Sequence, residues 1–237
     1  MNRLKDLLGK VKDSNISDSF EDSQKLFAQI AEELMCNNII CKGDREYAIV
    51  EIEFYLYSPT HRDWITYPRN IDAGKWFFHQ SGVDLTFGSQ FEKRDKIITE
   101  DSVFGGILIR GIYDLKIGKY IFGPQKCVNE LWQELDAFDH SKDYPIIKTI
   151  SSSCRIVNLM CCKRSINIDK ENKVKYWYKL FGSDIDVINY ANDIDIYSDN
   201  NKYLYRYFNL RHGEDARKFS EISAKARPSS WYPVKTE

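Results

Sequence analysis

The stretch Ile49-Val50-Glu51-Ile52-Glu53-Phe54-Tyr55-Leu56 decides the fold, because apolar and polar side chains alternate along it. A period of two is typical of a half-buried strand, and it places toward the core the residues Val50, Ile52, Phe54 and Leu56. The opposite face then carries two carboxylates and a phenol, Glu51, Glu53 and Tyr55. That face is either solvent-exposed surface, the usual place for charged residues, or the floor of a site.

Length and composition indicate a globular protein. The 237 residues can form one large domain or two small ones and can bury a sizeable core. Hydrophobic residues make up 43% and aromatic residues 14%, which excludes a disordered chain. The net charge is −1, from 34 basic and 35 acidic residues, so binding to nucleic acid would need a local basic surface.

The cysteines and the N-terminal segment indicate the compartment. The six cysteines have no C-x-x-C spacing, and residues 1–11 carry leucines at helical spacing among charges, unlike a signal peptide. No apolar run is long enough to cross a membrane. We therefore expect a cytoplasmic protein with free thiols and no membrane partner.

Periodicity predicts the elements around the opening strand. A short helix is expected over 1–13, and a second helix has a buried face made of Leu26, Phe27, Ile30, Ala31 and Leu34. Strands are expected over 38–41, 74–80, 105–112, 154–160 and 203–210. A helix starting at Gly123-Pro124 would share one face among Cys127, Val128, Leu131, Trp132 and Leu135. The fold class is α+β, divided into an N-terminal helix and link (1–20), a main domain (21–212) and a polar tail (213–237).

The side chains on their own leave the chemistry open. Glu51 and Glu53 are neighbours on one strand face, and such a pair can bind a metal, although only His61 is near and metal sites usually recruit more ligands. His61 and His79 each fit an ordinary surface or core histidine. The glycines lack the spacing of a phosphate-binding loop, and no G-x-S-x-G elbow occurs.

The order of several short motifs resembles the alkyladenine (3-methyladenine) DNA glycosylase family. The family pattern I-V-E-x-E-x-Y-L matches residues 49–56, and a loop histidine, His61, follows. The later landmarks are Pro68-Arg69-Asn70, an aromatic strand from Gly74 to Gly82, Ile107-Leu108-Ile109-Arg110, Gly123-Pro124-Gln125-Lys126-Cys127, Ser153-Cys154-Arg155-Ile156 and the segment from Tyr203 to Arg211. The resemblance spans about residues 23–211 and implies a single mixed domain with a curved antiparallel β-sheet flanked by helices.

The resemblance also implies a function, the excision of a modified or damaged base from double-stranded DNA without metal or cofactor. Glu53 matches the carboxylate that activates water against the anomeric carbon, and Tyr55 with His61 matches the pair that sandwiches the flipped base. The remaining matches are Phe78 as a third pocket aromatic, Gly88 in the place of an asparagine that excludes guanine, and Arg110 near the abasic phosphate. Further candidates are Arg155, Lys163 and Arg164 for phosphate contacts and Glu51 and His79 as supporting residues.

Three departures from the family pattern suggest altered substrate choice. Ser81 stands where the family has a bulky tyrosine wedge, Asp84 replaces an aromatic, and Gly88 would enlarge the pocket. A bulky modified base, for example a glucosylated cytosine of phage DNA, is then a reasonable substrate, in repair or in antiviral defence. Two alternatives stay open: a binder of modified bases that does not cut, and a metal-dependent nuclease that uses Glu51 and Glu53.

Overall fold

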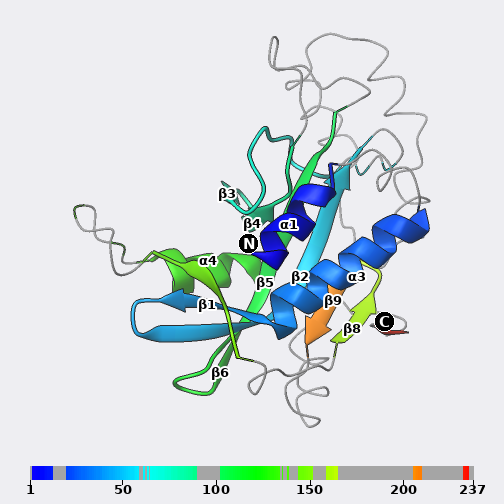
Figure 1. Cartoon of the computed structure of the whole chain (residues 1–237). Coiled ribbons are helices and arrows are strands. Elements are labelled where there is room, and N and C mark those ends of the chain that lie inside the picture. Colours follow the sequence, from blue (N-terminus) through cyan, green and yellow to red (C-terminus); the bar gives the residue numbers. More distant parts are fainter. Residues whose placement is uncertain are drawn as a thin grey trace.

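A computed structural model shows one mixed α+β domain built on a curled antiparallel sheet (Figure 1). The described residues are 2–12, 20–58, 61, 63, 65–89, 102–133, 135, 138, 144–151, 159–164, 205–209 and 232–234. Their helices are α1 (Arg3–Lys10), α3 (Phe20–Cys36) and α4 (Pro124–Trp132). Their strands are β1 (Asn38–Lys42), β2 (Arg45–Tyr57), β3 (Trp76–His79), β4 (Gly82–Thr86), β5 (Phe104–Asp114), β6 (Lys119–Phe122), β7 (Ile146–Thr149), β8 (Leu159–Cys162), β9 (Arg206–Asn209) and β10 (Tyr232–Pro233). The predicted fold class is confirmed.

The long strand β2 organises the sheet. Its neighbours along the main path are β9 and β5, in the order β10-β8-β9-β2-β5-β4-β3, while β1 pairs with the first half of β2 and with β7. β6 pairs with β5. Strands far apart in sequence therefore meet at β2, and all of these pairings are antiparallel.

One face of the sheet is covered by α1 and α3, which lie across it (Figure 1). The Phe27 ring of α3 stacks on Phe54 of β2 with ring centroids 4.4 Å apart, and Phe87 stacks beside both. Phe27 and Phe54 are fully buried, and burying one such side chain contributes roughly 1.5–3 kcal/mol. We call this side the helix face and the opposite side the second face.

β2 and β5 are irregular at the same level. Their register runs Ile49↔Ile112, Glu51↔Gly111 and Ile52↔Ile109, so it shifts on both sides of Glu51. Val50 packs with Ala48, Cys162 and Phe208 instead of joining Ile49 and Ile52 in the main core. Val50 is therefore buried as predicted, but on the side opposite to Ile52, because a bulge turns two consecutive side chains to the same side.

The segment boundaries follow the prediction in part. The predicted face of α3 is buried throughout, and α1 packs its leucines into the core, whereas α4 ends at Trp132 and leaves Leu135 outside the helix. Strands β4, β6, β7 and β10 were not predicted. Of the predicted strand 154–160, residues 154–158 lie outside the described residues, and β8 starts at Leu159. Most of 213–237 is also outside them, although Tyr232–Pro233 pairs with β8.

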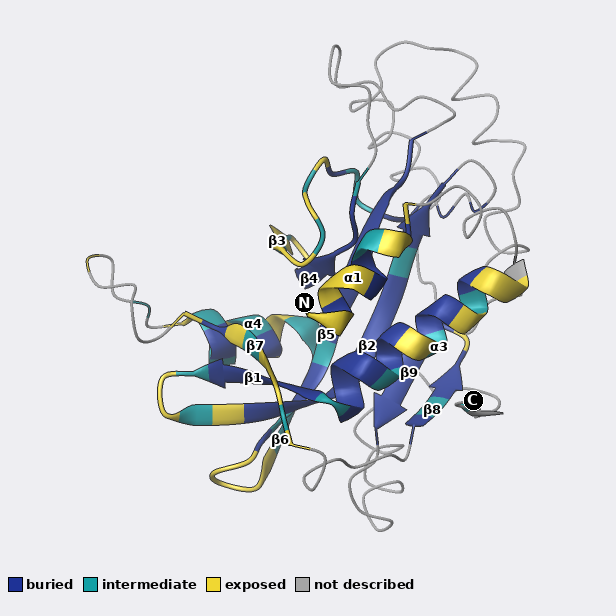
Figure 2. Cartoon of the chain, viewed as in Figure 1, coloured by how far each residue is buried: buried dark blue, intermediate teal, exposed yellow. Residues whose placement is uncertain are grey.

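Two further features concern the cysteines and the helices. The five described cysteines are buried, at Cys36, Cys41, Cys127, Cys161 and Cys162. None of the helices in the described ranges is long and apolar enough to cross a membrane. Figure 2 shows that burial extends along both β2 and β5, whereas α1 and α3 each keep an exposed stripe.

Candidate functional site

The second face of the sheet is buried and polar. Glu51 and Glu53 are 3% and 2% exposed, and Arg206 on β9 is 4% exposed. Of the two alternatives that alternation left open for this face, solvent-exposed surface is excluded for Glu51 and Glu53. The reason lies in pairing, because β9 brings Arg206 opposite Glu53 and Phe208 opposite Glu51.

Two arginines neutralise the two carboxylates. Arg110 donates from Nε to Glu51 Oε1 and from Nη1 to Glu53 Oε2, both at 2.9 Å. Arg206 donates from Nε and Nη2 to the same Oε1 of Glu51, at 2.8 and 2.5 Å. Glu51 therefore holds two guanidinium groups in place, which makes it a supporting residue. The nearby carboxylates raise the pKa of Arg110 above its ordinary value although burial opposes this.

Glu53 is fixed by one oxygen only. Its Oε2 accepts the Arg110 bond and a second bond from the Tyr55 hydroxyl at 2.7 Å. Within the described part of the chain, the hydrogen bonds to Glu53 all end on Oε2. The other oxygen of Glu53, Oε1, can therefore accept a hydrogen bond from a substrate or a water. Burial and the Glu53 charge raise the pKa of Tyr55 well above its ordinary value, so the phenol stays a donor.

Glycine at position 111 permits this arrangement. A Cβ on Gly111 would lie 2.9 Å from the Cβ of Glu51 and 2.9 Å from Cδ1 of Phe122. Such distances are shorter than van der Waals contact, so a larger residue would push Glu51 away from Arg110. The bulge and its glycine thus position both carboxylates.

Arg164 lies beside the site as a buried structural residue. Its guanidinium donates two bonds to Asp63, at 2.8 and 2.9 Å, and one to the Phe54 carbonyl at 2.8 Å. It also lies over the rings of Tyr55 and Tyr205, 4.6 and 4.3 Å from their centroids. Only 1% of its side chain is exposed, so the prediction that it contacts phosphate is wrong.

The other predicted phosphate contacts fall in different places. Lys163 is exposed, and a quarter of the Arg110 side chain is exposed while its guanidinium binds both carboxylates. Arg155 lies outside the described residues. Arg110 and the half-buried Tyr55 therefore mark the accessible side of the site.

His61 belongs to the aromatic core. Its Nδ1 donates to the Leu56 carbonyl at 2.8 Å, and its Nε2 accepts from the Tyr205 hydroxyl at 2.5 Å. The ring is edge-on to Phe27, which covers the helix face. Burial lowers the pKa of His61 although Asp63 opposes this, so the ring is neutral. These contacts orient His61 toward α3, and they do not form the predicted sandwich with Tyr55.

Two other predicted pocket residues lie away from Glu53. Phe78 is 48% exposed and lies edge-on to Trp132 of α4. Gly88 donates its N–H to the Leu8 carbonyl, and a Cβ there would meet Lys12 at 3.3 Å. The space next to Gly88 is thus filled by the end of α1, and it does not enlarge a pocket at Glu53.

A second ion cluster lies on the same face as Glu53. The register Glu53↔Leu108↔Asp84↔Phe77 places Phe77, and not Phe78, on the side of the carboxylates. Asp84 accepts from Arg69 at 2.6 Å and from His79 at 2.9 Å. Asp84, predicted as a departure from the family, is therefore the buried anchor of this cluster. Ser81 is exposed in the turn between β3 and β4.

The residues missed by sequence reasoning are mostly arginines and their acids. Arg206, Asp63 and Arg69 are all buried, and each makes a salt bridge. Arg206 had one usable signal, its place within the strand predicted over 203–210. Asp63 and Arg164 are 101 residues apart, so no local pattern links them.

The carboxylates are poorly suited to a metal. Arg110 and Arg206 already place two positive charges on Glu51 and Glu53, where a cation would be repelled. Within the described residues, no group of three or more His, Cys, Asp or Glu side chains is arranged to hold a metal ion.

Comparison with known proteins gives one similarity without a function. The chain is 27% identical over 142 residues to "Uncharacterized protein L759" of Acanthamoeba polyphaga mimivirus. The matched region covers 52% of this chain and 63% of that protein. The chain thus spans less than two thirds of this relative's length. No protein-family model and no solved structure matches the chain.

Proposed function

We propose that the protein is a monofunctional DNA glycosylase in which Glu53 activates the attacking water. The observation that carries the proposal is the fixed orientation of Glu53, with Oε2 bound by Arg110 and Tyr55 and Oε1 left to accept. A carboxylate held in this way can accept a proton from water while its charge stabilises an oxocarbenium-like sugar. The motif resemblance at residues 49–56 supports the same role.

The reaction needs the base outside the duplex. A base flipped from the stack can lie near Tyr55, the half-buried aromatic that is hydrogen-bonded to Glu53. Stacking a base on an aromatic side chain contributes ~1–3 kcal/mol, comparable with the cost of unstacking it. Since Arg164 lies against the Tyr55 ring, the guanidinium fixes the plane on which a base would stack.

The substrate proposed is DNA with a modified or damaged base. Because α1 fills the space at Gly88, this glycine does not favour a bulky base. Glucosylated cytosine therefore belongs in the test panel together with methylated and deaminated bases, without preference among them.

The test is base release from duplex oligonucleotides that carry methylated, deaminated or glucosylated bases, with EDTA present. Strand breaks that appear only after alkali report abasic sites. We expect Glu53→Gln to lower the rate by about 10²-fold or more, since general-base catalysis contributes that much. Glu46→Gln is the matched control, because Glu46 is exposed on the same strand.

Three results would count against the proposal. Direct breaks that EDTA abolishes would indicate the nuclease. Tight binding to modified DNA without alkali-sensitive sites would indicate the binder. Equal rates for Glu53→Gln and Glu46→Gln would remove Glu53 from the chemistry.

A further inference from the structure

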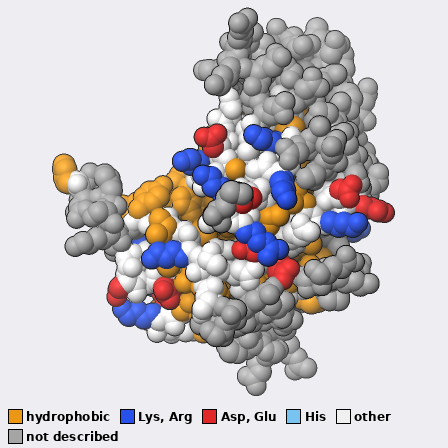
Figure 3. All heavy atoms as spheres, in the orientation of Figure 1, with side chains coloured by type: hydrophobic (Ala, Val, Ile, Leu, Met, Phe, Trp, Pro, Cys, Tyr) orange, Lys and Arg blue, Asp and Glu red, His pale blue; other side chains and the backbone are white. Residues whose placement is uncertain are grey.

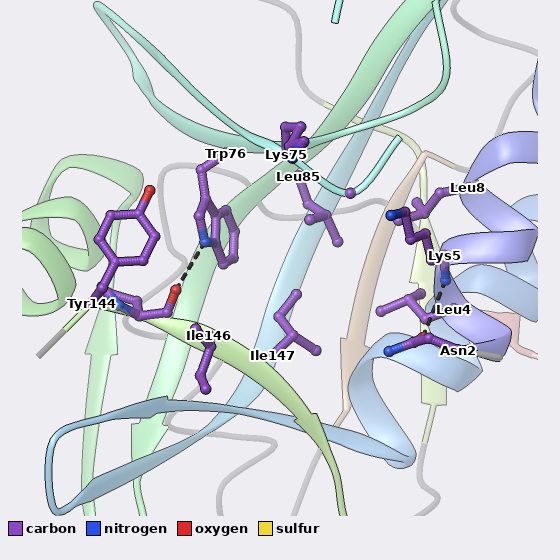
Figure 4. Close-up of a pocket in the computed structure, with 12 residues that line it drawn as sticks. Asn2, Leu4, Lys5, Leu8, Lys75, Trp76, Leu85, Tyr144, Ile146 and Ile147 are labelled. Carbon is purple, nitrogen blue, oxygen red and sulfur yellow. Dashed lines mark hydrogen bonds between the residues drawn. The ribbon is translucent and has the colours of Figure 1, made fainter. Parts of the chain in front are cut away.

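A cavity of about 380 Å³ lies on the helix face, between α1, the β3–β4 hairpin and the segment leading into β7 (Figure 4). Its apolar walls come from Leu4 and Leu8 of α1, Trp76 of β3, Leu85 of β4 and Ile147 of β7. Glu53 is on the opposite face of the sheet, so the cavity is separate from the proposed catalytic site. Small-molecule sites have volumes of about 300–1,000 Å³, and this cavity falls within that range.

The walls are held in place by the fold. The Trp76 indole donates from Nε1 to the Pro145 carbonyl at 3.0 Å and packs edge-on against Trp132. Leu4, Leu8 and Leu85 are at most 3% exposed. In Figure 4 the indole and the α1 side chains lie on opposite sides of the cavity. A preformed apolar site loses little conformational freedom when a ligand enters.

Two lysines give the cavity a positive rim. Lys5 and Lys75 are exposed lining residues, and the described lining includes no Asp or Glu. The Lys5 stem lies against the turn that precedes Lys75, because a Cβ on Gly74 would be 3.7 Å from Cγ of Lys5. On this side of the molecule, hydrophobic side chains reach the surface beside Lys and Arg side chains (Figure 3).

We propose that the cavity binds a small amphipathic anion, a carboxylate on an apolar chain or ring. The head group lies between Lys5 and Lys75, and the body lies against Trp76, Leu85 and Ile147. Lysine stems cover apolar surface while their ammonium groups stay in water, which suits this division between head and body. A neutral ligand would gain no attraction from the two ammonium groups, and a cation would be repelled by them.

The experiment measures decanoate binding to the full chain by tryptophan fluorescence and by calorimetry. Decanol and decyltrimethylammonium are the neutral and cationic controls of equal chain length. The variant Lys5→Gln/Lys75→Gln is compared with Lys10→Gln/Lys119→Gln, which removes the same charge from exposed lysines outside the cavity. We expect decanoate to bind about three- to tenfold more weakly to the first variant than to the second, the range for two partly exposed charge contacts.

A second variant separates the site from general surface binding. Ile146→Trp places a large side chain at the mouth, where Ile146 is 46% exposed, and should abolish decanoate binding without altering the fold. Glu53→Gln should leave binding unchanged. The proposal is overturned if decanoate does not bind at millimolar concentration, if decanol binds equally well, or if both lysine pairs weaken binding alike. Binding to anionic lipid vesicles without binding of monomeric decanoate would overturn it in favour of a membrane surface.

Discussion

The Asp63–Arg164 pair gives the sharpest test of what holds the second face together. Both side chains are at most 1% exposed, and the guanidinium makes three hydrogen bonds and lies over two tyrosine rings. Replacing Arg164 by Met keeps much of the side-chain volume but leaves the Asp63 carboxylate buried without its cation. Removing one partner of a buried pair costs about 3–5 kcal/mol.

For a chain of this length, 1 kcal/mol shifts the melting temperature by ~2–4 °C, so Arg164→Met should lower it by ~6–20 °C. Urea denaturation followed by circular dichroism gives the free energy of unfolding, and thermal scans give Tm. The double variant Asp63→Asn/Arg164→Met should be more stable than Arg164→Met alone, because it removes the unpaired charge. Lys116→Met is the control, since Lys116 pairs with Asp44 on the exposed surface.

A double variant no more stable than Arg164→Met would mean that the unpaired Asp63 charge is not the source of the lost stability. If Arg164→Met and Lys116→Met unfold at the same urea concentration, the buried pair contributes no more than an exposed one. Either result would refute the prediction.

Two further predictions concern the bulge and the core histidine. Gly111→Ala should destabilise the protein by ~1–3 kcal/mol, because the added Cβ clashes with Glu51. Gly9→Ala is the control: a Cβ there meets nothing within 4 Å, and the change should stabilise α1 by up to about 1 kcal/mol. The urea midpoints of the two variants are compared, and an equal shift in both would contradict the clash. Because burial lowers the pKa of His61 from 6.5, the unfolded chain binds a proton that the folded protein does not, and stability should fall as pH decreases below about 6.5 toward the lowered value. His61→Gln should reduce this slope between pH 7.5 and 5.5, and an unchanged slope would exclude His61 as its source.

The helices were predictable because their signal is local. The apolar face of α3 repeats at helical spacing within 17 residues, and each predicted residue of that face is buried. α4 likewise begins at the predicted proline, and the prediction fails only at its end, where Gln133 is extended. Short-range periodicity and capping are thus sufficient for these elements.

The second face could not be predicted locally. Alternation identified β2 as a strand, yet the burial of Glu51 depends on Arg206, which is 155 residues away. The placement of Val50 depends on a register shift against β5. Similarly, only the β3–β4 register shows that Phe77 rather than Phe78 lies beside Asp84. Strand pairing between distant segments carries this information, and a strand's own pattern does not.

The candidate site could be predicted only where its residues share one strand. Glu53 and Tyr55 follow from two-residue spacing on one strand, and the structure joins them by a hydrogen bond. His61 and Gly88 were assigned by order along the chain, and loops after a strand can turn to either face. Arg164 was assigned by charge alone, which does not distinguish an exposed cation from a buried one.

The matched irregularity of β2 and β5 has a consequence for changes in chain length. Because the register is the same on both sides, Ile49↔Ile112 and Ile52↔Ile109, each strand has two residues between these pairs. Deleting Val50 alone would leave one residue on β2 against two on β5 at this level, so the residues beyond it would shift by one position either in their pairing with β5 or in the face to which they point. Homologues that keep the carboxylate cluster should therefore vary by substitution at this level and place insertions or deletions in the connecting turns, or change both strands together.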